Sequence, residues 1–95
     1  MPDALQLVAL QEGLGGPWRL PEAGLGQFSI GRKASCQLNL PEAYAYVSGE
    51  HCRLKSVFRA GERATLLEDL SGNGTFINGV RVGRGKTEPV KEGDE

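Results

Sequence analysis

The stretch Ser71-Gly72-Asn73-Gly74-Thr75-Phe76-Ile77-Asn78-Gly79-Val80-Arg81-Val82 decides the fold class. It contains two short runs with β-strand character, residues 75–77 and 80–82, and Asn78-Gly79 stands between them. Asn-Gly in this position predicts a type I′ hairpin, because that turn needs positive φ at both central residues. This part of the chain is therefore expected to form β-strands.

The rest of the chain repeats the same pattern of short alternating runs between glycine-rich turns. Further strand candidates lie at residues 5–10, 17–20, 28–30, 36–40, 51–58 and 64–70. No window of helical length has apolar residues at the 3.6-residue period, and the best helix candidate, residues 41–45, is one turn at most. Strands at this spacing predict an all-β domain, a sandwich or a barrel.

Size and charge narrow the range of functions. A chain of 95 residues allows one domain. Its net charge of −1 gives no general affinity for nucleic acid, so an anion site has to be built locally from a few donors. No apolar run approaches the ~20 residues that cross a bilayer, and no signal peptide is visible. The two cysteines, Cys36 and Cys52, are expected to be buried free thiols in an intracellular protein.

Three polar patches follow or lead into the strand candidates. They read Gly31-Arg32-Lys33, Ser48-Gly49-Glu50-His51 and Ser71-Gly72-Asn73-Gly74-Thr75. A guanidinium, a hydroxyl and an amide on strand-connecting loops suit the binding of an anionic group, because each donates hydrogen bonds. No metal-ligand cluster and no paired catalytic carboxylates accompany them, so we expect neither metal, cofactor nor enzymatic activity.

The order and spacing of these patches resemble the forkhead-associated (FHA) domain. That family has Gly-Arg after an early strand, then Ser-x-x-His, then Asn-Gly-Thr-x-x-Asn-Gly, here Asn73 to Gly79. The resemblance covers roughly residues 5 to 95. It implies a two-sheet β-sandwich of about eleven strands, whose loops at one end bind phosphothreonine in an extended peptide. The sequences around residues 47–53 and 69–86 resemble the FHA domains of a checkpoint RING-finger ubiquitin ligase and of checkpoint kinases, respectively.

The resemblance also implies roles for individual residues. The phosphopeptide is expected to contact Arg32, Lys33, Ser48, Gly49, Asn73 and Thr75. Gly31, His51, Gly74 and Asn78 are expected to support the site, with His51 as a buried brace. Two roles stay open for Thr75, a peptide contact or a brace of its own turn. Tyr46 and Gly72 lie where a residue downstream of the phosphothreonine could be read.

One departure from the family pattern concerns the end of the sequence. FHA domains follow Gly-Asp with a final strand, and here Gly93-Asp94 is followed only by Glu95. We therefore expect residues 1–95 to be an FHA domain truncated before that strand, with an edge through which it could dimerise. The alternative to phosphopeptide binding is a phosphate-independent interaction or dimerisation sandwich. The resemblance further implies a nuclear protein of checkpoint or DNA-damage signalling, whose other parts could carry a kinase or ubiquitin-ligase domain.

Overall fold

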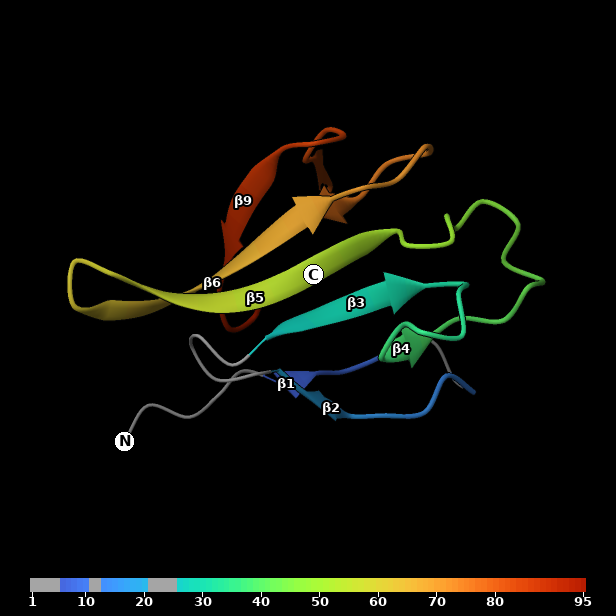
Figure 1. The fold of residues 1–95 in the computed structure, drawn as a ribbon, viewed down its shortest axis with the longest axis horizontal. Coiled ribbons are helices and arrows are strands. Elements are labelled where there is room, and N and C mark those ends of the chain that lie inside the picture. Colours follow the sequence, from blue (N-terminus) through green and yellow to red (C-terminus); the bar gives the residue numbers. More distant parts are fainter. Residues whose placement is uncertain (1–5, 11–12, 21–25) are drawn as a thin grey trace.

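The computed structural model describes residues 6–10, 13–20 and 26–95, and this part of the chain contains strands but no helix (Figure 1). The strands are β1 (Gln6–Leu7), β2 (Trp18–Arg19), β3 (Gln27–Gly31), β4 (Leu38–Asn39), β5 (Cys52–Arg59), β6 (Glu62–Asp69), β7 (Phe76–Ile77), β8 (Val80–Arg81) and β9 (Thr87–Val90). Among these residues no helix long and apolar enough to span a membrane occurs.

A five-stranded sheet in the order β4-β3-β5-β6-β9 forms the centre of the molecule. Its pairs are antiparallel except β3 with β4, which run parallel. Two further antiparallel pairs, β1 with β2 and β7 with β8, form separate small sheets. Figure 1 shows the β5–β6 hairpin turn at one end of the long axis and the loops around β3 and β4 at the other end.

Strict alternation on β5 and β6 turns one face of the sheet inward. Cys52, Leu54 and Ser56 are buried on β5, and they pair across the strands with Asp69, Leu67 and Thr65, which are buried on β6. Successive side chains of a strand point to opposite faces, so the residues between them lie on the outer face. The two cysteines are buried free thiols, as expected from the sequence.

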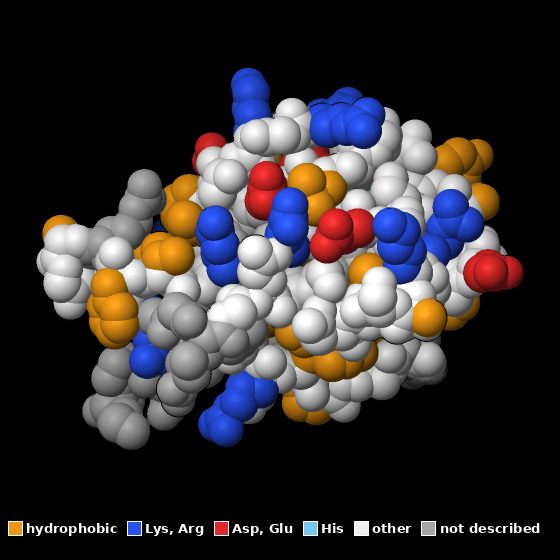
Figure 2. Space-filling model, in the orientation of Figure 1, with side chains coloured by type: hydrophobic (Ala, Val, Ile, Leu, Met, Phe, Trp, Pro, Cys, Tyr) orange, Lys and Arg blue, Asp and Glu red, His pale blue; other side chains and the backbone are white. Residues whose placement is uncertain are grey.

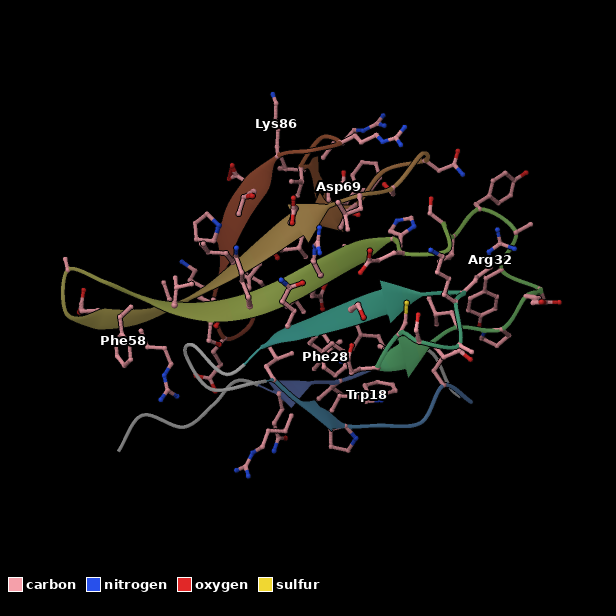
Figure 3. All side chains as sticks on the ribbon, viewed as in Figure 1. Trp18, Phe28, Arg32, Phe58, Asp69 and Lys86 are labelled. Atoms are coloured by element: carbon pink, nitrogen blue, oxygen red, sulfur yellow. The ribbon has the colours of Figure 1, made fainter. Side chains whose placement is uncertain are left out.

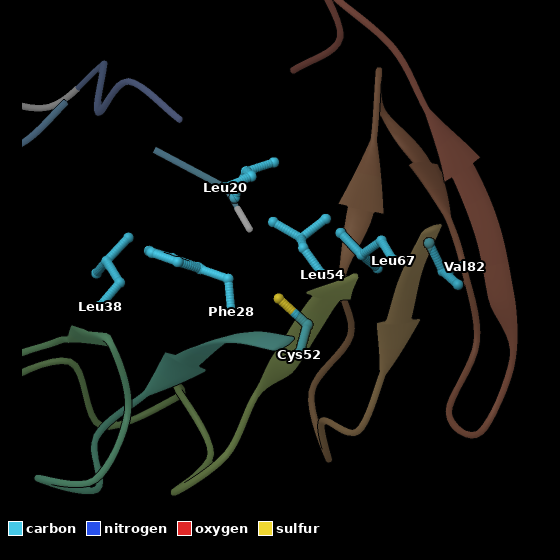
Figure 4. Close-up of a cluster of buried hydrophobic side chains, with 7 residues drawn as sticks. All are labelled: Leu20, Phe28, Leu38, Cys52, Leu54, Leu67 and Val82. Atoms are coloured by element: carbon cyan, nitrogen blue, oxygen red, sulfur yellow. The ribbon is translucent and has the colours of Figure 1, made fainter. Parts of the chain in front are cut away.

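The core lies between this inner face and the small sheets. Its buried members come from both layers and are Leu20, Phe28, Leu38, Cys52, Leu54, Leu67 and Val82 (Figure 4). Leu7 and Trp18 of the β1–β2 pair and Ile77 of the β7–β8 pair pack against them. The fold is therefore all-β with two packed layers, which confirms the predicted sandwich.

The predicted hairpin forms with the expected geometry. Asn78 and Gly79 have φ of 52° and 82°, and Phe76 pairs with Arg81 across the strands. Residues 41–45 form a turn in which Tyr44 N–H donates to the Pro41 carbonyl at 3.0 Å. Position 5 of the first strand candidate lies outside the described residues.

Strand β9 was missed by the sequence analysis, and the start of β6 was placed too late. Pro89 lies within β9, and proline argues against a strand because it has no N–H to donate. It is tolerated here because β9 is an edge strand whose one partner among the described strands is β6. Strand β6 begins at Glu62 rather than at residue 64, because Arg59 and Glu62 continue the ladder up to the turn.

Candidate functional site

The first polar patch lies directly against the second. Arg32 N–H donates to the Ser48 carbonyl at 3.2 Å, and Lys33 N–H donates to the Gly49 carbonyl at 2.9 Å. Gly31 is required by this approach, because a Cβ there would lie 2.8 Å from the Gly49 carbonyl carbon. The end of β3 and the loop before β5 therefore form one unit.

The side chains of Arg32 and Lys33 extend along the second patch. Arg32 is half-buried, and its Nε donates to the Val47 carbonyl. Lys33 is exposed and runs beside Gly49, where an added Cβ would lie 3.2 Å from the lysine Cε. Both cations lie at the same loop, and Figure 3 shows Arg32 at the end of the molecule opposite Phe58.

The third patch meets the second from the other side. Gly72 N–H donates to the Ser48 hydroxyl oxygen at 3.1 Å, and Asn73 Nδ2 donates to the Tyr46 carbonyl at 2.9 Å. A hydroxyl that accepts one hydrogen bond still has its own proton to donate, and the amide keeps its oxygen as an acceptor. The consecutive residues Tyr46, Val47 and Ser48 are thus contacted by Asn73, Arg32 and Gly72, so the three patches converge.

The His51 side chain connects the second patch to the third through hydrogen bonds. The Ser48 N–H donates to Nδ1 at 3.1 Å, and Nε2 lies 2.8 Å from the Gly74 carbonyl oxygen. Because Nδ1 accepts, Nε2 carries the proton and donates. His51 bonds the backbone of Ser48 and not its hydroxyl, so the pair does not form a nucleophile and base.

Asp69, which the sequence analysis did not select, orders the third patch. Its carboxylate accepts from Ser71 N–H at 2.9 Å, Ser71 Oγ at 2.6 Å, Thr75 N–H at 3.3 Å and Thr75 Oγ1 at 2.9 Å. The residue has no exposed surface. Its alternation with Leu67 and Thr65 on β6 was the signal in the sequence, since it predicts an inward carboxylate that needs donors.

The pKa of Asp69 reports the balance of these contacts. Burial alone raises the pKa of the carboxyl, but the hydrogen bonds from Ser71 and Thr75 outweigh burial and lower it below its ordinary value of 3.8. Asp69 is therefore ionised at neutral pH. Two roles were left open for Thr75, a peptide contact and a brace of its own turn. Its hydroxyl donates to Asp69 and so acts as the brace.

Gly74 and Asn78, both expected to support the site, contact different parts of the chain. Gly74 has a φ of +109°, which side chains rarely adopt, and its N–H donates to Ser71 Oγ at 2.8 Å. Asn78 lies in the turn between β7 and β8, where Nδ2 donates to the Asp94 carboxylate at 3.0 Å and Oδ1 accepts from Glu95 N–H at 3.0 Å. Asn78 therefore fixes the hairpin to residues 94–95 and is not brought to the loops.

The described residues hold no group of three or more His, Cys, Asp or Glu side chains that could bind a metal ion. The site instead offers donors: a guanidinium, an ammonium, a hydroxyl and backbone N–H groups around Gly49. Such a set suits a compact anion of high charge density.

Comparison with known protein families identifies the family to which this chain belongs. The family model described as the FHA domain matches residues 28–95, and the chain belongs to the FHA domain family. It is 46% identical over 68 residues to the ubiquitin-protein ligase CHFR of Xenopus laevis, covering 72% of this chain and 10% of CHFR. It is 40% identical over 72 residues to the probable serine/threonine-protein kinase fhkA of Dictyostelium discoideum, covering 70% of this chain and 12% of that protein. The chain thus spans about a tenth of the length of these relatives.

Solved structures show the same fold. The MEK1 FHA domain in complex with a phosphorylated HOP1 peptide superposes with a TM-score of 0.69 at 29% identity, over 81% of this chain and 74% of that one. The N-terminal FHA domain of Rad53p from S. cerevisiae, in complex with a phosphothreonine peptide, gives a TM-score of 0.62 at 28% identity, over 73% of this chain and 52% of that one.

Proposed function

We propose that this domain binds phosphothreonine-containing segments of other proteins and performs no chemistry on them. The observation that carries the proposal is the convergence of Arg32, Gly72 and Asn73 on the consecutive residues Tyr46 to Ser48. It brings one fixed cation, one hydroxyl and one amide to a single loop. The FHA domains of MEK1 and Rad53p, which share the fold, were solved with phosphopeptides.

The roles of the site residues follow from their chemistry. Arg32 takes the phosphate, because a planar guanidinium pairs with two phosphate oxygens at once and stays charged. The hydroxyl proton of Ser48 and the N–H of Gly49 supply further donors, and Lys33 adds charge beside them. Asn73 takes the peptide backbone, because its amide both donates and accepts. A phosphothreonine carries about −1.5 to −2 charge at pH 7, which matches this set.

The affinity should be modest. A few charge-assisted hydrogen bonds are opposed by the ordering of a flexible peptide, so we expect a Kd on the order of micromolar. A module of this strength suits reversible recruitment of the larger protein that carries it. Nuclear checkpoint or DNA-damage signalling is the context that we propose for that protein, supported by the likeness to CHFR.

Calorimetric titration of the chain with three peptides of one sequence tests the proposal. The peptides carry phosphothreonine, phosphoserine or unmodified threonine. We expect the phosphothreonine peptide to bind best and the unmodified peptide to give no measurable heat. Equal affinity for all three peptides contradicts phosphate recognition and leaves the phosphate-independent interaction sandwich as the better account.

A further inference from the structure

Two arginines that the proposed phosphate site does not use lie beside the third patch. Arg81 ends β8, and Arg84 lies in the turn between β8 and β9. Both side chains are exposed, and neither has a hydrogen bond or ion pair within the described part of the chain. Figure 2 shows Lys and Arg side chains gathered over this edge, at the top of the view.

The backbone holds Arg81 next to Gly74 and Thr75 of the third patch. A Cβ on Gly74 would lie 3.4 Å from Arg81 Nε and 3.0 Å from Phe76 Cε1, so both side chains extend over this glycine. Gly74 has no side chain to cover them, and Phe76 is 54% exposed. Val82 N–H donates to the Thr75 carbonyl at 2.9 Å, which fixes the hairpin to the loop.

The turn that carries Arg84 is hydrogen-bonded to the backbone of Asp69. Gly85 N–H donates to the Asp69 carbonyl at 2.7 Å, and Asp69 N–H donates to the Lys86 carbonyl at 3.1 Å. The residue whose carboxylate orders the third patch thus also positions this turn through its backbone. Both arginines therefore lie on backbone segments that are hydrogen-bonded to Asp69 or Thr75, the residues that flank the loop carrying Asn73.

Arg81 and Arg84 form no ion pair within the described part of the chain, although Asp94 and Glu95 lie at the turn of the β7–β8 hairpin, hydrogen-bonded to Asn78. The chain as a whole carries −1, so uncompensated cations here are not part of a general positive field. The carboxylate of Asp69 is buried and engaged by Ser71 and Thr75. The Cα of Glu50 lies next to Gly31, at the end of β3. Glu88 follows on β9, but no ion pair joins it to either arginine.

We propose that Arg81 and Arg84 form a second anion-binding site that reads acidic side chains flanking the phosphothreonine, on the side of the peptide that passes over Gly74. This inference rests on the proposed function, because it assumes a peptide anchored at Arg32. Arginine suits the task, since its fork pairs with a carboxylate through two hydrogen bonds. The preferred ligand class is therefore a phosphothreonine with an acidic segment on one side.

The test compares peptides and matched variants of the 95-residue chain. The peptides are a phosphothreonine peptide with neutral flanks, two versions with aspartates on the N-terminal or C-terminal side, and an unphosphorylated acidic peptide. The variants are Arg81→Gln with Arg84→Gln and, as a control of equal charge change, Arg19→Gln with Lys55→Gln. Arg19 and Lys55 are also exposed, on β2 and β5.

We expect one of the two acidic phosphopeptides to bind the wild type about tenfold more tightly than the neutral one at low ionic strength, with the gain shrinking as salt is added. The arginine double variant should lose this gain and keep its affinity for the neutral phosphopeptide, while the control keeps both. The inference is overturned if neither acidic peptide gains, if both gain equally, or if the control loses as much as the arginine variant. Loss of phosphate dependence in every peptide contradicts the proposed function as well.

Discussion

The Nε2 atom of His51 lies 2.8 Å from the carbonyl oxygen of Gly74, a residue 23 positions further along the chain. On the other side of the same ring, Nδ1 accepts from the Ser48 N–H at 3.1 Å. One imidazole thus fixes the distance between the loop that carries the phosphate donors and the loop that carries Asn73. The site depends on a side chain that we do not expect to touch the ligand.

Replacing this ring should weaken binding indirectly. His51→Ala leaves the Ser48 N–H and the Gly74 carbonyl without their partner, at a cost of about 2 kcal/mol in the free energy of unfolding. Because the two loops lose their connection, we expect phosphopeptide affinity to fall by about tenfold, equivalent to ~1.4 kcal/mol. Urea denaturation and calorimetry measure the two effects, with Lys55→Ala as a surface control. An unchanged affinity in the folded variant would show that the imidazole does not organise the site.

Asp69 should contribute to stability in a pH-dependent manner. Its pKa in the folded chain is below the ordinary 3.8, so the contribution is complete above about pH 4 and is lost as the pH falls through the lowered value. Asp69→Asn removes this contribution and cannot accept all four hydrogen bonds, at a cost of about 2–4 kcal/mol. Denaturation at several pH values between 3 and 7 measures both effects.

Asp94 provides the control for that experiment. Its pKa is also lowered from the ordinary 3.8, chiefly by the hydrogen bond from the Asn78 amide and also by the Lys91 N–H. Asp94→Asn should leave most of the acid sensitivity in place, because the hydrogen bonds of Asp94 lie at the surface, where solvent screens its charge. If Asp69→Asn is as acid-sensitive as the wild type, the buried carboxylate is not its source.

Gly31 should tolerate no side chain, for reasons of space and not of φ. An added methyl group meets the backbone of Gly49 and Glu50, which cannot move without breaking the contacts of Arg32 and Lys33. We expect Gly31→Ala to cost about 1–3 kcal/mol. Gly72→Ala is the matched control, because only Ser48 Oγ lies near its Cβ position, at 4.0 Å. Equal melting temperatures for the two variants would disprove the close approach.

The thiols should be unreactive in the folded domain. Burial, followed by the charges of Asp69 and Cys36, raises the pKa of Cys52 to about 12. Cys36 is 7% exposed, and its Sγ lies 3.4 Å from the Gly49 carbonyl oxygen. An aromatic disulfide reagent at pH 8 should therefore titrate neither thiol natively and both in concentrated guanidinium chloride. Rapid modification of the native protein would contradict the packing of the core around β5.

The sequence was sufficient to predict what depends on local chemistry. Asn78-Gly79 specified its turn through positive φ, and alternation along β5 specified which side chains face inward. The residue types of the three patches indicated an anion site, and their order and spacing gave the resemblance to the FHA domain. In contrast, β9 was hidden because Pro89 is compatible with a strand only at the edge of a sheet, and edge position is a property of the whole fold.

The role of Asp69 was hidden for a related reason. Alternation along β6 points the carboxylate inward, but only the folded loop brings the hydroxyl groups of Ser71 and Thr75 to it. Likewise, Asn78 was expected to have a structural role, but only the tertiary structure shows that its partners are Asp94 and Glu95. Long-range positions of this kind follow from packing and not from residue type.

Chemical-shift mapping tests the central claim most directly. A phosphothreonine peptide is added to the ¹⁵N-labelled chain, and its unphosphorylated twin serves as the control. We expect the largest phosphate-dependent shifts at the Arg32 Nε–H, the backbone N–H groups of Ser48 and Gly49, and the side-chain amide of Asn73. The turn at Ala60-Gly61, at the opposite end of the molecule, should not respond. Shifts concentrated at that turn, or equal shifts with both peptides, would contradict a phosphothreonine site built by the three converging patches.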